Sequence, residues 1–406
     1  MTFRIALSGL NAASADLGVT ANNIANANTT GFKGSRAQFA DFFPQSAHGL
    51  SDNAIGSGVR LDKVAQQFSQ GSVNFTDNNL DLALSGEGFF TLSDNGATVY
   101  SRAGAFGTDR SGFVVNASNQ RLQVYPPVAG GTAFDTAQLS DLQLSTSDNP
   151  PAATTSIETG VNLPANASVP ATATFDATDP TSYNHTTSVT IYDSLGAPHT
   201  ANLYFVKAAA ANDWNLNVLV DGVAAGPATP LSYSSSGQLT APAGGSITLP
   251  PATTTTGSAP LSLDLDLAGS TQYGERFSVN SLRQDGYATG RLTGIEVTDE
   301  GIVQARFTNG QATPLGQVAL ANFANPQGLQ QLGDASWGET FSSGAVIRGQ
   351  AGDTNFGQIQ SGALEASNVD LTAQLVNMIT AQRNFQANAQ MISTSDQITQ
   401  TIINIR

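Results

Sequence analysis

The N-terminal segment carries an apolar stripe with helical spacing. Five large apolar residues recur at intervals of three, four and seven: Phe3, Leu7, Leu10, Leu17 and Ile24. Together with small residues between them they form one face of a helix about 25 residues long. Gly31 is a plausible stop, because glycine is common just beyond the end of a helix.

A second apolar stripe occupies the C-terminal segment. Its large members are Leu371, Leu375, Met378, Phe385, Ile392 and Ile402. Ser367 and Asp370 resemble a capping box at its start, and the segment from there to Arg406 would be about 55–60 Å long as a helix. Gln382 and Asp396 interrupt the stripe, so it predicts a weak coiled-coil surface that tolerates changes of register.

Both predicted terminal helices need a partner. Terminal segments tend to be disordered unless something ties them down, and these two helices can be covered by each other or by neighbouring subunits. A plainer interpretation packs both onto a globular core. The remaining faces of the C-terminal helix are rich in amides rather than charges, which favours close packing in an assembly or a wall that must stay wet.

Between the termini the pattern is that of short β-strands. Apolar runs bounded by Gly, Asp and Asn occur, for example, at residues 88–92, 112–115 and 187–192. Residues 293–307 predict a hairpin. Strands at intervals of about 8–12 residues favour sandwich or barrel domains. The expected fold is multidomain α+β, with long terminal helices forming a coiled-coil inner layer and two mainly β domains inserted between them.

Charge is sparse and unevenly placed along the chain. There are 16 basic and 31 acidic residues, giving a net charge of −15, and only 12% of all residues are charged. Residues 148–275 hold most of the acidic excess, whereas the two terminal segments together are neutral. No basic surface is present for a phosphate backbone, so we expect no nucleic-acid partner.

The sequence offers little for catalysis or metal binding. Cysteine is absent, which excludes disulfides and thiolate chemistry, and the three histidines are well separated. Ser, His and Asp occur without a GxSxG motif. Asp264 and Asp266 alternate with leucines, so they predict a solvated strand face rather than a calcium loop. We expect no catalytic site, no cofactor and no metal, and we assign Trp214 and Trp337 to packing.

Membrane and targeting signals are weak. No apolar run approaches the ~18 residues of a membrane span, so we expect no membrane insertion. The first residues, MTFRIALSGLNAAS, make a poor secretory signal, because polar residues follow the single early arginine. If the protein leaves the cell, it uses another route.

Four separated motifs resemble the flagellar rod and hook protein family. Residues 8–33, SGLNAASADLGVTANNIANANTTGFK, resemble its N-terminal signature, and residues 363–406 resemble its C-terminal counterpart. Residues 85–116 resemble the family's first β segment. Residues 188–207, SVTIYDSLGAPHTANLYFVK, resemble the outer domain of hook-type members. The motifs occur in the family's order and touch almost the whole chain.

The resemblance implies a layered subunit. The layers are an inner helical and extended-arm assembly domain (1–70 with 363–406), a middle β-rich domain (71–147 with 283–362) and an outer inserted β domain (148–282). The family's Asn-rich motif falls on Asn22, Asn23, Asn26 and Asn28, at the end of the N-terminal helix. With the two apolar stripes, Asn22, Asn23 and Asn26 are the expected assembly interface.

The implied function is that of a structural subunit of the bacterial flagellar hook. Such subunits polymerise into a hollow, bendable helical tube that acts as a universal joint, transmits torque from rod to filament and passes exported subunits. The implied partners are further copies of the chain, the distal rod protein, the hook cap protein, the hook–filament junction proteins and the flagellar type III export apparatus. The implied location is extracellular, in the hook and basal body, after export without a cleaved signal peptide.

Two alternatives remain open at this point. A distal rod protein shares the terminal motifs, but the acidic insert argues for a hook-type member. A secreted β-rich adhesin or glycan-binding protein belongs to another class, and it would need neither paired terminal helices nor export without a signal peptide. If a tube forms, we expect the amide-rich C-terminal helix to line its pore.

Overall fold

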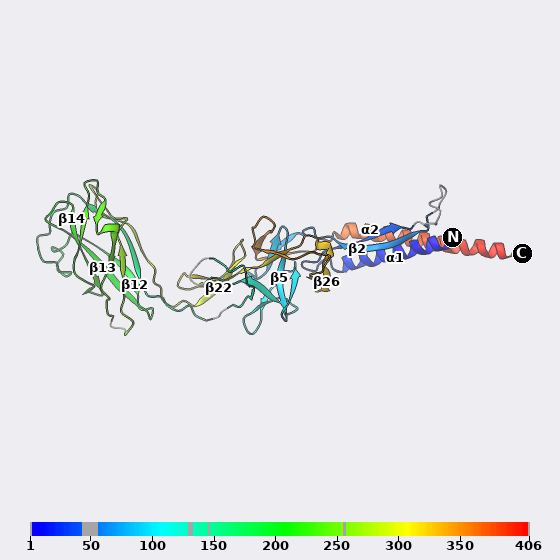
Figure 1. Ribbon diagram of the computed structural model, residues 1–406, viewed down its shortest axis with the longest axis horizontal. Coiled ribbons are helices and arrows are strands. Elements are labelled where there is room, and N and C mark those ends of the chain that lie inside the picture. The colour runs from blue at the N-terminus through cyan, green and yellow to red at the C-terminus, as the bar shows by residue number, and fades with distance from the viewer. Residues whose placement is uncertain (1, 43–55, 129–132, 145–146, 255–256, 405–406) are drawn as a thin grey trace. The chain divides into compact units, whose positions relative to one another are not determined.

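The computed structural model describes residues 2–42, 56–128, 133–144, 147–254 and 257–404 (Figure 1). The chain divides into two compact units. Unit 1 comprises Met1–Thr146, Gly294–Arg306 and Ala312–Arg406, and unit 2 comprises Ser147–Thr293 and Phe307–Gln311. Both ends of the chain therefore belong to unit 1.

Unit 1 contains the two long helices that the apolar stripes predict. Helix α1 spans Thr2–Ala25 and helix α2 spans Leu371–Asn404. Neither helix contains proline, which would remove a backbone hydrogen bond. In α2 several hydroxyls are satisfied within the helix, for example where Thr380 donates to the carbonyl of Val376 at 2.9 Å.

The start of α2 differs from the expected capping box of Ser367 with Asp370. Asp370 caps the helix itself, because its Oδ1 accepts the backbone N–H groups of Thr372 at 2.8 Å and Ala373 at 3.2 Å. Ser367 Oγ accepts the N–H of Val369 instead, at 3.3 Å. The capping-box prediction is therefore wrong in its pairing, although Asp370 does mark the helix start.

The β part of unit 1 is built around one large sheet. Its 13 strands run in the order β22-β23-β24-β9-β5-β6-β27-β26, with β7, β8, β10, β25 and β28 attached at the sides. These strands are β5 (Phe89–Asp94), β6 (Ala97–Ser101), β7 (Gly107–Thr108), β8 (Val114–Val115), β9 (Arg121–Tyr125), β10 (Ser140–Asp141), β22 (Leu292–Val297), β23 (Ile302–Phe307), β24 (Ala312–Val318), β25 (Leu320–Asn322), β26 (Gln330–Gly333), β27 (Ser336–Gly338) and β28 (Ile347–Gly349). The hairpin predicted within residues 293–307 is confirmed as β22 and β23.

Three two-stranded ladders connect this sheet to the helices. They are β1 (Ser35–Asp41) with β2 (Val59–Gln66), β3 (Val73–Phe75) with β30 (Ala363–Glu365), and β4 (Leu82–Ser85) with β29 (Gln358–Ser361). All three are antiparallel. The second ladder pairs β3, the first strand after the β1–β2 ladder, with β30, the last strand before α2.

Unit 1 has two apolar cores. The larger lies under the big sheet and includes Leu84, Phe90, Leu122 and Val318. The smaller is aromatic and contains Phe89, Tyr100, Phe323 and Trp337, with Phe68 packed against it. Edge-to-face contacts hold the aromatic core together, since the Tyr100 and Phe323 ring centres are 4.8 Å apart at 79°.

Unit 2 is a β-sandwich. One sheet has six strands: β12 (His185–Tyr192), β13 (Pro198–Lys207), β14 (Asp213–Val220), β15 (Val223–Ala224), β16 (Thr229–Tyr233) and β17 (Leu239–Ala241). The other has five: β11 (Ser156–Pro164), β18 (Ser246–Thr248), β19 (Asp264–Asp266), β20 (Thr271–Tyr273) and β21 (Ser278–Gln284). Both sheets contribute to one core around the fully buried Trp214, as a sandwich requires.

His199 ties two loops of unit 2 together. Its Nδ1 lies 2.5 Å from Asp221 and its Nε2 lies 3.3 Å from Asp193. Burial opposes the charged form of His199 and lowers its pKa. The hydrogen bonds to the two aspartates outweigh this effect, so the pKa is raised above its usual 6.5. No serine nucleophile is bonded to the ring in these contacts, so the cluster has the geometry of a structural clasp.

Candidate assembly interface

Helices α1 and α2 lie side by side and run antiparallel (Figure 1). Gly9 faces Asn388, because a Cβ atom added to the glycine would lie 2.5 Å from the Asn388 Oδ1. At the other end Asn23 Nδ2 donates to Gln374 Oε1 at 3.3 Å. Asn23 lies 14 residues after Gly9 and Gln374 lies 14 residues before Asn388, so the two helices keep one register along the pair.

The buried seam of the pair is made of small residues on the α1 side. Ala6, Ala13 and Thr20 are buried and lie seven residues apart. The facing positions of α2 are partly or fully buried and alternate by four and three: Gln374, Met378, Ala381, Phe385, Asn388, Ile392 and Ser395. Small side chains allow close approach, and the sevenfold spacing keeps the same face toward the partner.

The large apolar residues predicted for the interface of α1 flank this seam. Leu10, Leu17 and Ile24 are half-buried, whereas Phe3 and Leu7 are exposed. Asp16 lies on the seam side, seven residues after Gly9, and burial raises its pKa. The N-terminal stripe is therefore only partly used inside the subunit, and its first turn and a half remains open to solvent.

The predicted apolar residues of α2 fall into two groups. Met378, Phe385 and Ile392 belong to the seam that faces α1 and are half-buried. Leu371 and Leu375 instead follow an exposed row with Ile379, four residues apart, and Leu375 and Ile379 are 51% and 50% exposed. Ile402 lies in the last turn, where the structure does not describe its side chain. Further exposed apolar residues of α2 are Val376, Met391, Ile398 and Ile403.

Helix α2 is longer than its partner. On the observed register Thr2 of α1 lies level with Ser395, so Asp396–Asn404 extends past the start of α1 by about 13 Å. Figure 1 shows this overhang as the red end of α2 beyond the blue start of α1. Ile398 and Ile403 on the overhang are exposed, which leaves an apolar helix end without cover in the described part of one subunit.

The asparagines of the predicted Asn-rich motif shape the end of α1. Asn23 is buried and pairs with the backbone of Ser35, donating to its carbonyl at 2.7 Å and accepting its N–H at 2.8 Å. Asn26 Nδ2 donates to the carbonyl of Asn22 at 3.0 Å, which finishes the last helical turn. Asn22 is exposed. Asn23 is thus the member that fixes both the β1 strand and α2.

A buried charge cluster joins the two chain ends to the β part of unit 1. Lys33 Nζ lies 2.6 Å from Glu365 Oε1, and an Arg102 guanidinium nitrogen lies 3.4 Å from Oε2. Lys33 also donates to the Ser69 carbonyl at 2.9 Å, and Glu365 accepts the Gly71 N–H at 2.9 Å. The Glu365 side chain is fully buried. One carboxylate therefore holds four segments of unit 1 together.

Burial controls the ionisation of this cluster. It lowers the pKa of Lys33, and the hydrogen bond and charge of Glu365 offset part of that effect. Burial also lowers the pKa of Arg102, again opposed by Glu365. Gly31 is needed beside the cluster, since its φ is 69° and an added Cβ would lie 2.4 Å from the Ala103 backbone nitrogen. The sequence does not predict this cluster, since its only signal there is three lone charges in a chain poor in charge.

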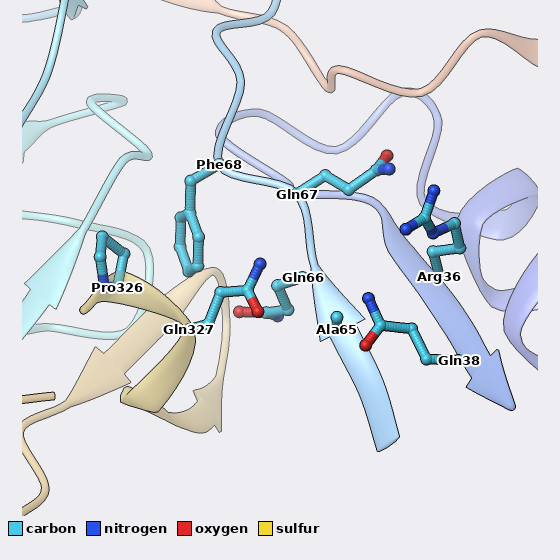
Figure 2. Close-up of a pocket in the computed structure, with 8 residues that line it drawn as sticks. All are labelled: Arg36, Gln38, Ala65, Gln66, Gln67, Phe68, Pro326 and Gln327. Carbon is cyan, nitrogen blue, oxygen red and sulfur yellow. The ribbon is translucent and has the colours of Figure 1, made fainter. Parts of the chain in front are cut away.

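A groove runs between the β1–β2 ladder and the short helix η2 (Pro326–Gly328), as Figure 2 shows. Its volume is about 320 Å³, and its lining residues are Arg36, Gln38, Ala65, Gln66, Gln67, Phe68, Pro326 and Gln327. Gln66 Oε1 accepts the Trp337 indole N–H at 2.7 Å. Gln66 Nε2 is buried and has no hydrogen-bond partner among the described residues.

Two further findings concern the described residues alone. They contain no cluster of three or more His, Cys, Asp or Glu side chains with the placement to hold a metal ion. Within the same ranges, neither helix is long and apolar enough to span a membrane.

Four protein-family models match separate stretches of the chain. They are the flagella basal body rod protein (residues 3–33), the flagellar hook protein FlgE/F/G D1 domain (83–178), the flagellar basal body protein FlaE D2 domain (162–287) and the flagellar basal body rod FlgEFG protein C-terminal region (360–405). Together with the paired terminal helices, they place the chain in the class of flagellar rod- and hook-type structural proteins.

Curated relatives narrow this class. The chain is similar to the flagellar hook protein FlgE of Salmonella typhimurium, with 40% identity over 418 residues and full coverage of both chains. It is 39% identical to that of Escherichia coli K12 with full coverage of both, and 33% identical to that of Rhizobium meliloti over 100% of this chain and 98% of the relative. The chain belongs to the flagellar hook protein FlgE family.

A solved structure has a similar fold. The crystal structure of Helicobacter pylori flagellar hook protein FlgE2 superposes with a TM-score of 0.55 at 14% identity, covering 72% of this chain and 100% of that one. The expected resemblance to the rod and hook family is confirmed, and the relatives favour the hook type over the rod type and over an adhesin.

Proposed function

We propose that the chain is the structural subunit of the bacterial flagellar hook and polymerises with copies of itself into a hollow, bendable tube. Full-length similarity to hook proteins supports this proposal. In such a tube the subunits would transmit torque from rod to filament and leave a channel for exported subunits. The protein would act outside the cell, without enzymatic activity, after export by the flagellar type III apparatus and without a cleaved signal peptide.

The layers of the tube follow from the order of the domains. We assign residues 1–70 with 363–406 to an inner layer, 71–147 with 283–362 to a middle layer, and 148–282 to an outer layer. In the inner layer α1 and α2 act as an antiparallel coiled coil, which the sevenfold spacing of Ala6, Ala13 and Thr20 supports. The acidic excess in residues 148–275 would then lie on the outside.

The observation that carries the proposal is the uncovered apolar surface of α2. A helix pair in a monomer normally turns its large apolar residues inward, but here Leu375 and Ile379 are about half exposed although Ala381 in the seam beside them is buried. On the α1 side, alanine and threonine fill the seam instead. We infer that these exposed residues, with Phe3, Leu7 and the overhang of α2, contact neighbouring subunits.

The contacts between copies must not close into a ring if the subunits are to form a tube. The exposed row of α2 and the first turns of α1 are different surfaces, so a contact between them is heterologous, and heterologous contacts that do not close produce helical filaments. The distal rod protein, the hook cap protein and the hook–filament junction proteins would meet the same surfaces at the two ends of the tube.

A pair of matched variants tests the interface. Leu375→Asn with Ile379→Asn removes two of the three residues of the exposed row, and Gln386→Asn with Gln390→Asn alters exposed polar positions of the same helix. Electron microscopy of the seeded proteins should show tubes for the parent chain and the glutamine variant, and monomers for the Leu375/Ile379 variant. Circular dichroism should show equal helix content in all three monomers. Tubes of normal length from the Leu375/Ile379 variant would refute the assigned interface.

A further inference from the structure

The loop between β27 and β28 presents one aromatic side chain entirely to solvent. Phe341 is 104% exposed, although the loop around it is held firmly. Ser343 is fully buried, and its Oγ donates to the Thr340 carbonyl at 2.7 Å. Asn325 Nδ2 donates to the Ser342 carbonyl at 2.9 Å. A large apolar group displayed on a preorganised loop is typical of a binding anchor, because little conformational entropy is lost when it docks.

The groove of Figure 2 has the features needed to receive such an anchor. Phe68 and Pro326 give it an apolar wall, and its volume of about 320 Å³ accommodates a phenyl ring. The buried Nε2 of Gln66 lacks a partner among the described residues and offers a hydrogen-bond donor beside that wall. A buried donor without a partner is destabilising, so an incoming carbonyl would be favoured there.

The loop and the groove carry charges of opposite sign. Arg36 lines the groove, and Glu339 lies two residues before Phe341. Both side chains are exposed. The loop does not fill the groove of its own subunit, because its hydrogen bonds to Asn325 hold it in place with the Phe341 ring in solvent.

We propose that the groove lined by Phe68, Pro326 and Gln66 receives the Phe341 loop of a second copy. The phenyl ring packs against the apolar wall, a loop carbonyl accepts the free N–H of Gln66, and Glu339 pairs with Arg36. Anchor and groove are different surfaces of unit 1, so the contact is heterologous and repeats along an open assembly. This contact lies outside the terminal helices and rests on the proposed function in so far as the second copy belongs to the polymer.

Cross-linking between two single-cysteine proteins tests the contact. The chain has no cysteine of its own, so Ser342→Cys beside the anchor and Gln67→Cys in the groove are the only reactive thiols. The two proteins, one of them enlarged by a tag, are mixed, seeded and treated with a short bismaleimide. We expect a mixed dimer of intermediate size on a denaturing gel, and none when Ser235→Cys, an exposed position of unit 2, replaces Gln67→Cys.

A second measurement uses the anchor itself. Phe341→Ser should raise the critical concentration for polymerisation at least about tenfold, as expected for an interface anchor, whereas Val223→Ser at another exposed apolar position should leave it within about twofold. Because Phe341 is fully exposed, neither variant should change the thermal unfolding of the monomer. Arg36→Glu should weaken assembly, and Arg36→Glu with Glu339→Arg should restore it.

The outcomes separate this contact from the proposed function. Tubes with the mixed dimer support the contact. Tubes without a mixed dimer overturn it and leave the hook function standing. A mixed dimer without tubes supports the contact but contradicts the hook function, and the absence of both overturns the two together.

Discussion

Replacing Glu365 tests how the chain ends are fixed to the β part of unit 1. Glu365→Gln keeps the size and polarity of the side chain but removes the carboxylate that pairs with both Lys33 and Arg102. Both cations are buried. The substitution therefore leaves two positive charges in a low-dielectric site without their counter-ion, which is the costly way to break a buried ion pair.

The expected loss is about 3–5 kcal/mol in the free energy of unfolding of unit 1. For a unit of this size each kcal/mol corresponds to about 2–4 °C, so the midpoint should fall by about 6–20 °C. Lys33→Met alone should also destabilise unit 1. The double variant, Lys33→Met with Glu365→Gln, should lose about 0.5–3 kcal/mol less stability than the sum of the losses of the two single variants, because it has one uncompensated charge fewer.

Tryptophan fluorescence during thermal unfolding is the assay. Each unit holds one tryptophan, Trp337 in unit 1 and Trp214 in unit 2, so a Trp214→Phe background reports on unit 1 alone. Glu300→Gln at an exposed position is the control and should change stability by less than about 0.5 kcal/mol. An unfolding midpoint for Glu365→Gln equal to that of the control would refute the stabilising role of the buried charge cluster.

Two further predictions follow from the helix seam and from unit 2. Gly18→Ala should stabilise α1 by about 0.5–1 kcal/mol, because nothing lies within 4 Å of the added Cβ. The Gly9→Ala protein should be about 1–3 kcal/mol less stable than the Gly18→Ala protein, because Asn388 must move. Equal denaturant midpoints for the two variants would contradict the observed register. Because the pKa of His199 is raised above 6.5, its clasp contributes fully below about pH 6.5 and is lost as pH rises through the higher folded pKa. In a Trp337→Phe background, tryptophan fluorescence should therefore show the unfolding midpoint of unit 2 falling above neutral pH, and the midpoint should stay flat when His199→Gln is added. His185, whose pKa burial lowers, affects only the acid side. A flat profile in the parent would contradict the clasp.

The sequence predicts the elements of this fold better than their partners. Periodicity locates both terminal helices, and alternation locates strands such as β12 and β13, because these signals depend on near neighbours. In α1, however, the large row of Leu10 and Leu17 and the small row of Ala6 and Ala13 share the same sevenfold spacing. Periodicity alone cannot decide which row faces α2, and the structure places the small row in the seam.

Contacts between residues far apart in the sequence cannot be predicted from periodicity. Lys33 and Glu365 are 332 residues apart, and nothing in their local sequence marks them as partners. The pairing of Asn23 with Gln374 across the helices spans 351 residues. The asparagine itself was expected at the interface from the family motif, but its hydrogen bonds to the Ser35 backbone follow only from the turn that brings β1 back beside α1.

Under the proposed function, copies of the chain form a hollow tube through their terminal helices. Cryo-electron microscopy of polymers seeded from the purified full-length chain tests it most directly. A hook subunit should give curved hollow tubes in which α1 and α2 are innermost and Leu375 and Ile379 are covered by neighbouring subunits. Polymers with the helices on the outer surface, or a chain that stays monomeric after seeding, would contradict it.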